Sequence, residues 1–273
     1  MKNIYLIANW KMNPVSEKEA KALAKGVATG IRKIKPKRTE VVLCPPFPYI
    51  KSIMARPSAA IPASKTGLGT YNPPVRRSPS VGGKPNFSLG AQNCHYENSG
   101  AYTGETSPKM LEDMGCKYVI IGHSERRHYF KEDSEFINKK INAVFSSKMI
   151  PVLAVGEREG ESVNVVVEQL KESLRGISAT RVKQLIIAYE PVWAIGTGKA
   201  ATVNDAMSAR LLIQKTLSEL YSRNTAESVP ILYGGSTNSK NISSFIIDAG
   251  MNGALVGGSS LKAEEFVKMI EKL

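Results

Sequence analysis

The amino-acid sequence predicts an α/β protein of the (β/α)8 barrel class, in which eight parallel strands are ringed by helices. Two observations lead to this prediction. Short runs rich in Val, Ile and Leu alternate with longer amphipathic segments, and the apolar runs number eight in 273 residues. Strict alternation implies a parallel sheet with helices outside it, and eight repeats in about 250 residues fit a closed barrel. An open, doubly wound sheet is the alternative, and the count favours the barrel.

Each predicted strand is densely apolar rather than alternating, as expected of strands that are covered on both faces. The strands are Ile4–Trp10, Glu40–Cys44, Phe87–Gln92, Tyr118–Gly122, Ile150–Val155, Gln184–Tyr189, Pro230–Tyr233 and Gly253–Val256. Helical periodicity fills much of the sequence between them. The helical segments are Ser16–Ile34, Val163–Leu174, Asn204–Tyr221 and Ala263–Leu273, with a short one near Tyr49–Met54. The first begins with Ser-Glu-Lys-Glu, the pattern of a capping box.

Residues 56–86 interrupt this alternation of predicted strands and helices. This region holds six prolines, four glycines, five basic residues and no acidic residue. We expect a single domain over residues 1–273, with this region as a surface insertion on the amino-terminal face of the barrel. The alternative is a docking segment, because Pro-rich cationic sequence can bind partners in an extended form.

Composition excludes several classes of protein. No apolar stretch approaches the roughly 18 residues that span a bilayer, and the run Ile4–Ala8 is too short for a signal-peptide core, so we expect a cytoplasmic protein without a membrane partner. The formal charge is +13, but the basic residues are dispersed and do not interleave with aromatic ones, so no nucleic-acid partner is expected. Cys44, Cys94 and Cys116 are widely spaced, which predicts reduced, buried thiols rather than disulfides or a zinc site.

Candidate catalytic residues stand just after predicted strands, where a barrel carries its active site. Lys11 follows the first strand, and its ammonium group would point into the barrel mouth. The fourth strand is followed by His123, Ser124 and Glu125. His123 stands where a short helix would begin, and a helix N-terminus disfavours a proton on imidazole, so it suits a neutral hydrogen-bond donor. Glu190 ends the apolar sixth strand, where poor solvation strengthens a carboxylate as a base.

Each of these residues also has a simpler interpretation, because a lone Lys is usually solvated and a lone His is usually structural. The segment after Glu190 contains glycines and resembles a lid. It comprises Pro191, Val192, Trp193, Ala194, Ile195, Gly196, Thr197, Gly198 and Lys199. Its end does not fit a P-loop, which needs four residues between its glycines and a Ser or Thr after the Lys.

Paired glycines follow the last two strands, in Gly234-Gly235-Ser236 and in Leu255-Val256-Gly257-Gly258. Either pair alone could be a plain turn. The loops after strands seven and eight are the usual phosphate site of this barrel, and glycine lets backbone N–H groups approach an anion closely. A base, a neutral donor, an ammonium group and a phosphate cradle suit proton abstraction beside the carbonyl of a small phosphorylated sugar. We find no metal-ligand cluster or dinucleotide fingerprint and expect no cofactor.

Taken together, these motifs resemble the triosephosphate isomerase family. The matching blocks run in the family's order from residue 4 to the C-terminus. They are Ala8–Asn13, Cys44–Phe47, Gly90–Asn93, Gly100–Glu105, Ile121–Arg127, Tyr189–Lys199, Tyr233–Ser236 and Leu255–Lys262. The resemblance implies an isomerase of glycolysis and gluconeogenesis that interconverts dihydroxyacetone phosphate and D-glyceraldehyde 3-phosphate through an enediolate.

The resemblance also implies a role for individual residues. Glu190 would move the proton, neutral His123 would donate to the developing oxyanion, and Lys11 would stabilise negative charge. Asn9 would help to place the substrate, while Ser124 and Glu125 would orient the site. The substrate and phosphate contacts would further include Gly196, Ser236, Leu255, Gly257 and Gly258. The family is usually a homodimer, in which Thr103 and Glu105 would contact the partner.

The sequence departs from the family pattern in two respects. The 56–86 segment has roughly twenty more residues than the usual connection, and an Arg–Asp pair of the family is replaced by Gln214 and Asn252. We expect an amide–amide hydrogen bond in place of that ion pair. Two rival functions remain: a phosphosugar aldolase, for which no strand offers a Schiff-base Lys, and a catalytically silent binding barrel, against which Lys11, His123 and Glu190 argue.

Overall fold

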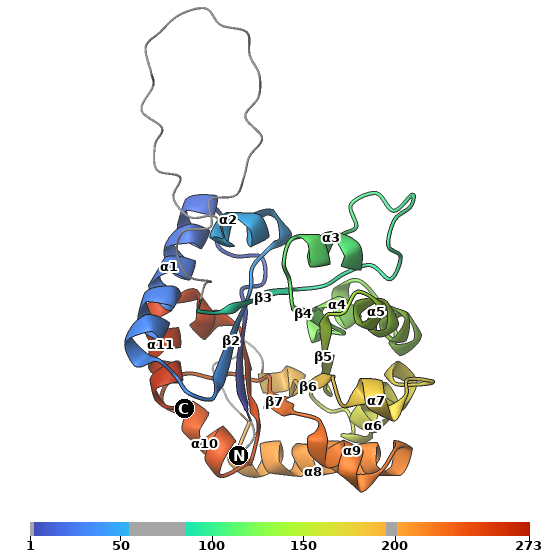
Figure 1. Cartoon of the computed structure of the whole chain (residues 1–273). Coiled ribbons are helices and arrows are strands. Elements are labelled where there is room, and N and C mark those ends of the chain that lie inside the picture. Colours follow the sequence, from blue (N-terminus) through green and yellow to red (C-terminus); the bar gives the residue numbers. More distant parts are fainter. Residues whose placement is uncertain (1–2, 55–85, 195–200) are drawn as a thin grey trace, which may run out of the picture.

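A computed structural model of the chain describes residues 3–54, 86–194 and 201–273 (Figure 1). The expectations for most of the 56–86 insertion and for Ile195–Lys199 of the lid fall outside these ranges. Within the described part of the chain, no helix has the length and apolar character needed to cross a membrane.

The described strands form a closed parallel barrel in which each strand pairs with its neighbours in sequence and β8 pairs with β1. The strands are β1 (Ile4–Asn9), β2 (Thr39–Cys44), β3 (Ser88–Ala91), β4 (Tyr118–Ile121), β5 (Ile150–Val155), β6 (Ile186–Tyr189), β7 (Ile231–Tyr233) and β8 (Gly253–Val256). All eight coincide with predicted strands to within two residues at either end. The barrel is confirmed, and the open sheet is excluded.

Helices surround the strands on the outside of the barrel (Figure 1). They are α1 (Glu17–Ile34), α2 (Ile50–Met54), α3 (Pro108–Asp113), α4 (Ser124–Tyr129), α5 (Ser134–Ser146), α6 (Asn164–Ser173), α7 (Ala179–Val182), α8 (Val203–Leu220), α9 (Arg223–Ser228), α10 (Ile242–Ile247) and α11 (Ala263–Glu271). Short 3₁₀ turns lie at Phe47–Tyr49 (η1), Val192–Ala194 (η2) and Gly258–Leu261 (η3). The five helical segments expected from the sequence are α1, α2, α6, α8 and α11.

Two of the helix starts differ from expectation in an informative way. Ser16 caps α1 by accepting from the backbone N–H of Glu19 at 3.3 Å, but Glu19 does not complete the expected capping box. The complete box forms at α8 instead, where Thr202 and Asp205 each accept from the other's backbone N–H. A reciprocal box satisfies two of the unpaired N–H groups at a helix start, so α8 is the better anchored of the two.

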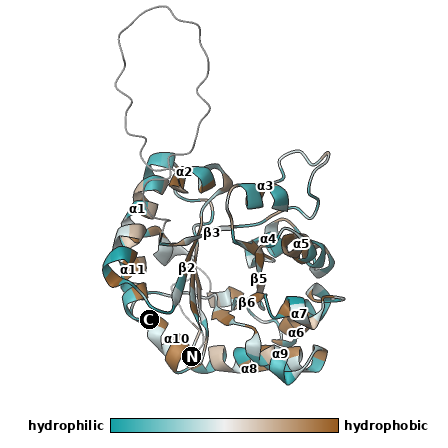
Figure 2. Ribbon diagram, in the orientation of Figure 1, coloured by the Kyte–Doolittle hydropathy of each residue, from teal (hydrophilic) through white to brown (hydrophobic). Residues whose placement is uncertain are grey.

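Successive residues of a strand pack into two separate apolar cores, which explains why the strands do not alternate with polar residues. On β1, Leu6 and Ala8 belong to the layer between strands and helices. Ile7 between them belongs to the barrel interior, which Ile120 and Leu232 also fill. The outer helices carry both hydrophobic and hydrophilic residues (Figure 2), as helices with one buried face should.

A polar cluster lies at the amino-terminal end of the barrel around Glu40 of β2. Its Oε1 accepts from Ser88 Oγ at 2.7 Å, Tyr118 OH at 3.0 Å and Lys117 Nζ at 3.1 Å. Burial acts to raise the pKa of Glu40, but the three hydrogen bonds and the Lys117 charge outweigh it and the pKa is lowered. The ionised carboxylate therefore ties β2 to β3 and β4.

A second polar cluster is deeply buried beneath α4 and α5. Lys140 is 1% exposed and donates to Glu132 Oε1 at 2.7 Å and to Asn93 Oδ1 at 2.9 Å. Arg126 Nε donates to the same Glu132 oxygen at 2.7 Å. Burial lowers the pKa of Lys140, although Glu132 opposes the shift. This cluster joins the loop after β3 to α4 and α5.

The three cysteines are free and buried, as predicted. Burial raises the pKa of the Cys94 and Cys116 thiols to about 12, so they stay protonated and unreactive.

The expected hydrogen bond between Gln214 and Asn252 is wrong. Gln214 Oε1 accepts from Arg210 Nη1 at 2.9 Å, one turn earlier on α8. Asn252 Oδ1 accepts from the backbone N–H of Ile231 at 3.0 Å, at the start of β7. Each amide oxygen is thus satisfied by a different donor, and no direct bond joins these two described side chains.

Candidate active site

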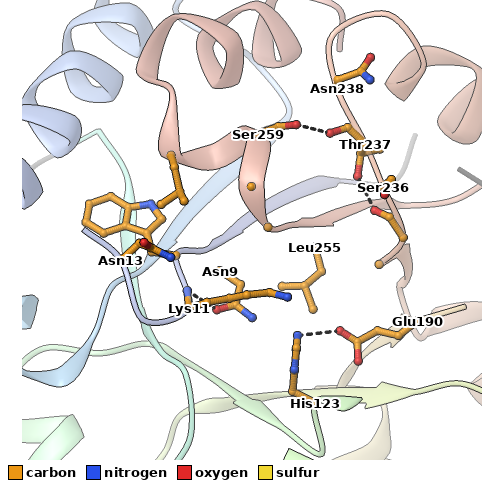
Figure 3. A pocket seen from close by; sticks show the side chains of 16 residues that line it. Asn9, Lys11, Asn13, His123, Glu190, Ser236, Thr237, Asn238, Leu255 and Ser259 are labelled. Carbon is orange, nitrogen blue, oxygen red and sulfur yellow. Dashed lines mark hydrogen bonds and ion pairs between the residues drawn. The ribbon is translucent and has the colours of Figure 1, made fainter. Parts of the chain in front are cut away.

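A cavity of about 410 Å³ opens at the carboxyl ends of the strands (Figure 3). Its walls come from the residues after β1, β4, β6, β7 and β8, which the barrel brings to one end. They include Asn9, Lys11, Asn13, His123, Glu190, Gly234, Gly235, Ser236, Leu255, Gly257, Gly258 and Ser259. Eight predicted catalytic or substrate contacts therefore meet in one cavity, namely all of the residues just named except Asn13, Gly234, Gly235 and Ser259. Two other predicted residues, Ser124 and Glu125, do not line it.

His123 is fixed in one orientation by the start of α4. It is the residue that caps this helix, and its Nδ1 accepts from the backbone N–H of Glu125 at 3.2 Å. A ring nitrogen that accepts a hydrogen bond carries no proton, so the imidazole is neutral with its proton on Nε2. Nε2 points into the cavity, toward Glu190 (Figure 3).

Glu190 is 2% exposed, and both of its carboxylate oxygens have partners. Oε1 lies 3.0 Å from His123 Nε2, and Oε2 accepts from the backbone N–H of Ser124 at 2.9 Å. The Glu190 backbone is held by a hydrogen bond from its N–H to Val155 O at 2.7 Å. These contacts hold the carboxylate at the wall of the cavity.

Lys11 reaches the cavity from an unusual backbone conformation, with φ of 53° in the left-handed region. Two hydrogen bonds hold this turn: Lys11 N–H donates to Asn9 Oδ1 at 3.0 Å, and Gln92 Nε2 donates to Lys11 O at 2.8 Å. The Lys11 ammonium lies 2.5 Å from Glu125 Oε1. The side chain extends across the cavity beside Asn9 and Leu255 (Figure 3).

The glycine pair after β8 leaves the backbone open at one side of the cavity. A Cβ on Gly258 would meet no atom within 4 Å, and one on Gly257 would lie 3.5 Å from Lys11 Cε. The N–H groups of these residues can therefore approach a bound anion near the Lys11 side chain. Ser236 directs its Oγ to the carbonyl of Ala194 at 2.7 Å, which connects this cradle to the described part of the lid.

Both ends of the lid segment are anchored to the barrel. On one side, Trp193 Nε1 and Tyr189 OH donate to Glu157 Oε1 at 3.0 and 2.9 Å. On the other side, Ala201 N–H donates to Tyr233 OH at 3.0 Å. Burial raises the pKa of Tyr233 to about 12, so its hydroxyl stays neutral.

Sequence reasoning missed the loop after β5. Gly156 touches the Glu190 backbone, and Glu157 holds Tyr189 and Trp193. The signal was present, because these residues follow a predicted strand as the others do. Gln169, whose amide donates to Gly156 O and accepts from Gly156 N–H at 2.9 Å each, lies within a helix and carried no such signal.

Thr103 and Glu105 lie away from this cavity, on the exposed loop after β3. Within the described ranges, no group of three or more His, Cys, Asp and Glu side chains could hold a metal ion.

The fold is a (β/α)8 barrel, and its cavity places a carboxylate and an imidazole beside backbone N–H groups that can bind an anion. These features are typical of the class of isomerases that act on small phosphorylated substrates. The sequence profile described as triosephosphate isomerase matches residues 4–66 and 73–273. The break at residues 67–72 falls within the segment 56–86, where the sequence led us to expect an insertion.

Curated relatives agree over nearly the whole length of each chain. The triosephosphate isomerase of Dictyoglomus turgidum is 40% identical to this chain over an alignment 277 positions long. The alignment covers 97% of this chain and 98% of that protein. The triosephosphate isomerases of Caldanaerobacter subterraneus and Dictyoglomus thermophilum are 40% and 39% identical and cover 99% of this chain. The chain belongs to the triosephosphate isomerase family, and it is an isomerase.

Proposed function

We propose that Glu190 carries the proton in the reaction of this enzyme, the glycolytic interconversion of dihydroxyacetone phosphate and D-glyceraldehyde 3-phosphate. The observation that supports this proposal best is the pair of His123 Nε2 and Glu190 Oε1, 3.0 Å apart. Both side chains are buried and line one cavity at the barrel mouth. A base and a neutral donor at this spacing can act on adjacent atoms of one small substrate.

The reaction then proceeds by one proton transfer from carbon, one between the two oxygens and one back to carbon. The carbonyl oxygen of a bound triose phosphate would accept a hydrogen bond from His123 Nε2–H, which frees Glu190 Oε1. Glu190 removes a proton from the carbon beside the carbonyl, and the electron pair moves onto the carbonyl oxygen to form an enediolate. The proton of the substrate's hydroxyl group passes to this oxygen by way of His123 Nε2, and Glu190 returns its proton to the former carbonyl carbon, so that the hydroxyl oxygen becomes the new carbonyl oxygen. A positioned base contributes about 10²–10⁴-fold in rate, and one oxyanion donor about 10²–10³-fold.

Binding would be shared between the two sides of the cavity. Lys11, with Asn9 and Leu255 beside it, would lie along the substrate and stabilise its negative charge. Backbone N–H groups of Ser236, Gly257 and Gly258 would hold the phosphate, and the same role is proposed for Gly196. Ser124 and Glu125 would orient Glu190, His123 and Lys11 through the contacts described above. A lid from Pro191 to Lys199 would exclude water from the enediolate.

Glu190→Gln tests the assignment of the base. We expect kcat for glyceraldehyde 3-phosphate to fall by about 10²–10⁴-fold, because the amide cannot accept the proton. Binding of glycerol 3-phosphate, which carries the phosphate but no carbonyl, should be unchanged and serves as the control for a folded site. Turnover near that of the wild type would refute the assignment.

We also propose a homodimer. Large apolar side chains are exposed on the single chain at Met12 (90%), Val15 (85%) and Tyr102 (42%). Exposed apolar groups of this size favour burial against a partner, and Thr103 and Glu105 follow Tyr102 on its loop. Thr103→Arg should shift the mass measured by sedimentation from dimer to monomer. A wild-type protein that is already monomeric would contradict the proposal.

A single domain over residues 1–273, with an insertion at 56–86, is our proposal for the domain organisation. It is supported by a family match that extends over residues 4–66 and 73–273 and breaks only within that segment. A cytoplasmic location stays a prediction.

A further inference from the structure

The segment that carries Glu190 rests on the loop after β5. Two backbone hydrogen bonds join the two segments: Glu190 N–H donates to Val155 O at 2.7 Å, and Val192 N–H donates to Glu157 O at 2.9 Å. Gly156 lies between these two bonds, and a Cβ built on it would overlap the carbonyl oxygen of Glu190. The backbones of Gly156 and Glu190 are therefore in direct contact, and a shift of one displaces the other.

Gly156 is in turn held by the side chain of Gln169, on helix α6. Gln169 Nε2 donates to Gly156 O, and Gln169 Oε1 accepts from Gly156 N–H, each at 2.9 Å. One amide side chain thus satisfies both polar groups of the Gly156 backbone. These two bonds fix the orientation of the peptide units on either side of Gly156.

Helix α6 is a rigid support for this amide. Val166 and Leu170 are fully buried and belong to the apolar layer between the strands and the helices. Gln169 follows Val166 by three residues, so it lies on the same face of the helix. A helix packed in this way cannot shift without opening voids in the core. Gln169 therefore connects a fixed helix to the loop that contacts Glu190.

We propose that Gln169 is a positioning residue for the reaction, which acts through Gly156 to hold the Glu190 carboxylate at the wall of the substrate cavity. The proposal rests on the role of Glu190 as the base. Gln169 does not line the substrate cavity, so it reaches the substrate only through Glu190. Such support matters to the rate, because a displacement of about 1 Å at a catalytic group costs on the order of 10²-fold.

Gln169→Met tests this role, because it keeps the length of the side chain and removes both hydrogen bonds to Gly156. We expect kcat to fall about tenfold, since Gly156 and Glu190 can then shift by part of 1 Å. KM should stay close to that of the wild type, because Lys11 and the glycine pair after β8 are not touched. A general loss of folded enzyme would lower the concentration of active sites, which titration with a tight inhibitor measures, and would not lower kcat per site.

Gln214→Met is the matched control. Gln214 is also a half-buried glutamine within a helix, and its Oε1 accepts from Arg210 Nη1 at 2.9 Å. It does not line the substrate cavity. This variant should lower stability to urea in the same way and leave kcat unchanged.

Gln169→Glu gives a second measurement, which separates positioning from stability. A carboxyl group can accept from Gly156 N–H in either form, but it can donate to Gly156 O only when it is protonated. The ionisable side chains that line a second cavity of about 220 Å³ together with Gln169 are Arg127, Arg158, Glu161 and Glu190. Their formal charges cancel, so the introduced carboxyl group should titrate near the ordinary Glu pKa of about 4.3.

The quantity to compare is kcat of Gln169→Glu divided by kcat of the wild type at the same pH. It should be low at pH 8 and rise about two- to threefold by pH 5, where roughly one sixth of the introduced carboxyl groups are protonated. The same ratio for Gln214→Glu should not change with pH, because Gln214 uses its amide only as an acceptor.

Three results would overturn the inference: a Gln169→Met enzyme with kcat within about threefold of the wild type, a loss that appears only as a raised KM, or a relative kcat of Gln169→Glu that is independent of pH. If Glu190→Gln keeps its turnover, the proposed function fails and the inference fails with it. If Glu190→Gln loses turnover and Gln169→Met does not, only the inference is refuted.

Discussion

Gly156→Ala should disable the enzyme without changing any group that touches substrate. Gly156 follows β5 and packs directly on the backbone of Glu190. A Cβ at this position would overlap the Glu190 carbonyl oxygen and lie 2.6 Å from its carbonyl carbon. Both atoms belong to the backbone, and the backbone of Glu190 is itself held by Val155. The clash therefore cannot be relieved by turning a flexible side chain.

The size of the effect follows from this geometry. Non-bonded carbon atoms sit about 3.5–4.0 Å apart, so roughly 1 Å of separation must be opened between Gly156 and Glu190. Moving a catalytic group by about 1 Å costs on the order of 10²-fold in rate. Overpacking of this kind also costs about 1–3 kcal/mol of stability. We expect kcat to fall about 100-fold, with a smaller change in KM.

The assay is steady-state isomerisation, with urea unfolding to establish that the variant is folded. Gly30→Ala is the control, because its Cβ would overlap the Val267 side chain where α1 packs on α11, and neither residue lines the cavity. It should alter stability and leave kcat unchanged. A folded Gly156→Ala enzyme with kcat within about threefold of the wild type would refute the geometric argument.

Three further predictions concern stability and metal ions. The pKa of Glu40 is lowered in the folded state, so its contribution to stability is present above the unfolded pKa of about 4.3 and is lost as the pH falls through the folded value. Glu40→Gln should thus be less stable than the wild type to urea at neutral pH and equal to it in strong acid; equal stability at neutral pH would contradict this. Lys140→Met should lower the free energy of unfolding by about 3 kcal/mol, because it removes one of two cations from the buried Glu132. The double variant Lys140→Met with Glu132→Gln should recover part of this loss. A Lys140→Met protein as stable as the wild type would count against the prediction. Activity should survive dialysis against EDTA, and a loss that added divalent metal restores would show that a metal is required.

Local patterns were enough to predict where the strands lie. Each strand of the barrel is buried on both sides, so a run such as Tyr118–Ile121 is apolar throughout and stands out against amphipathic helices. The same logic located most of the candidate site. Residues that follow parallel strands must meet at one end of a barrel, so Lys11, His123 and Glu190 could be grouped before any distance was known.

Contacts between distant segments could not be predicted in this way. Gln214 and Asn252 were expected to pair with each other. Gln214 instead accepts from Arg210 one turn earlier on α8, and Asn252, just before β8, accepts from the backbone N–H of Ile231 at the start of β7. The close contact of Gly156 with Glu190 depends on how two loops pack. Spacing along the chain says nothing of that distance.

The sequence by itself determined the barrel, its eight strands and the set of side chains at its mouth, because burial and chain order are local properties. The tertiary structure alone decided how those side chains act. It brought His123 Nε2, which follows β4, to 3.0 Å from Glu190 Oε1, which follows β6. It also set Glu190 between two cavities. Both outcomes depend on how separate strands and their loops pack against one another. This packing is fixed only when the whole barrel has formed.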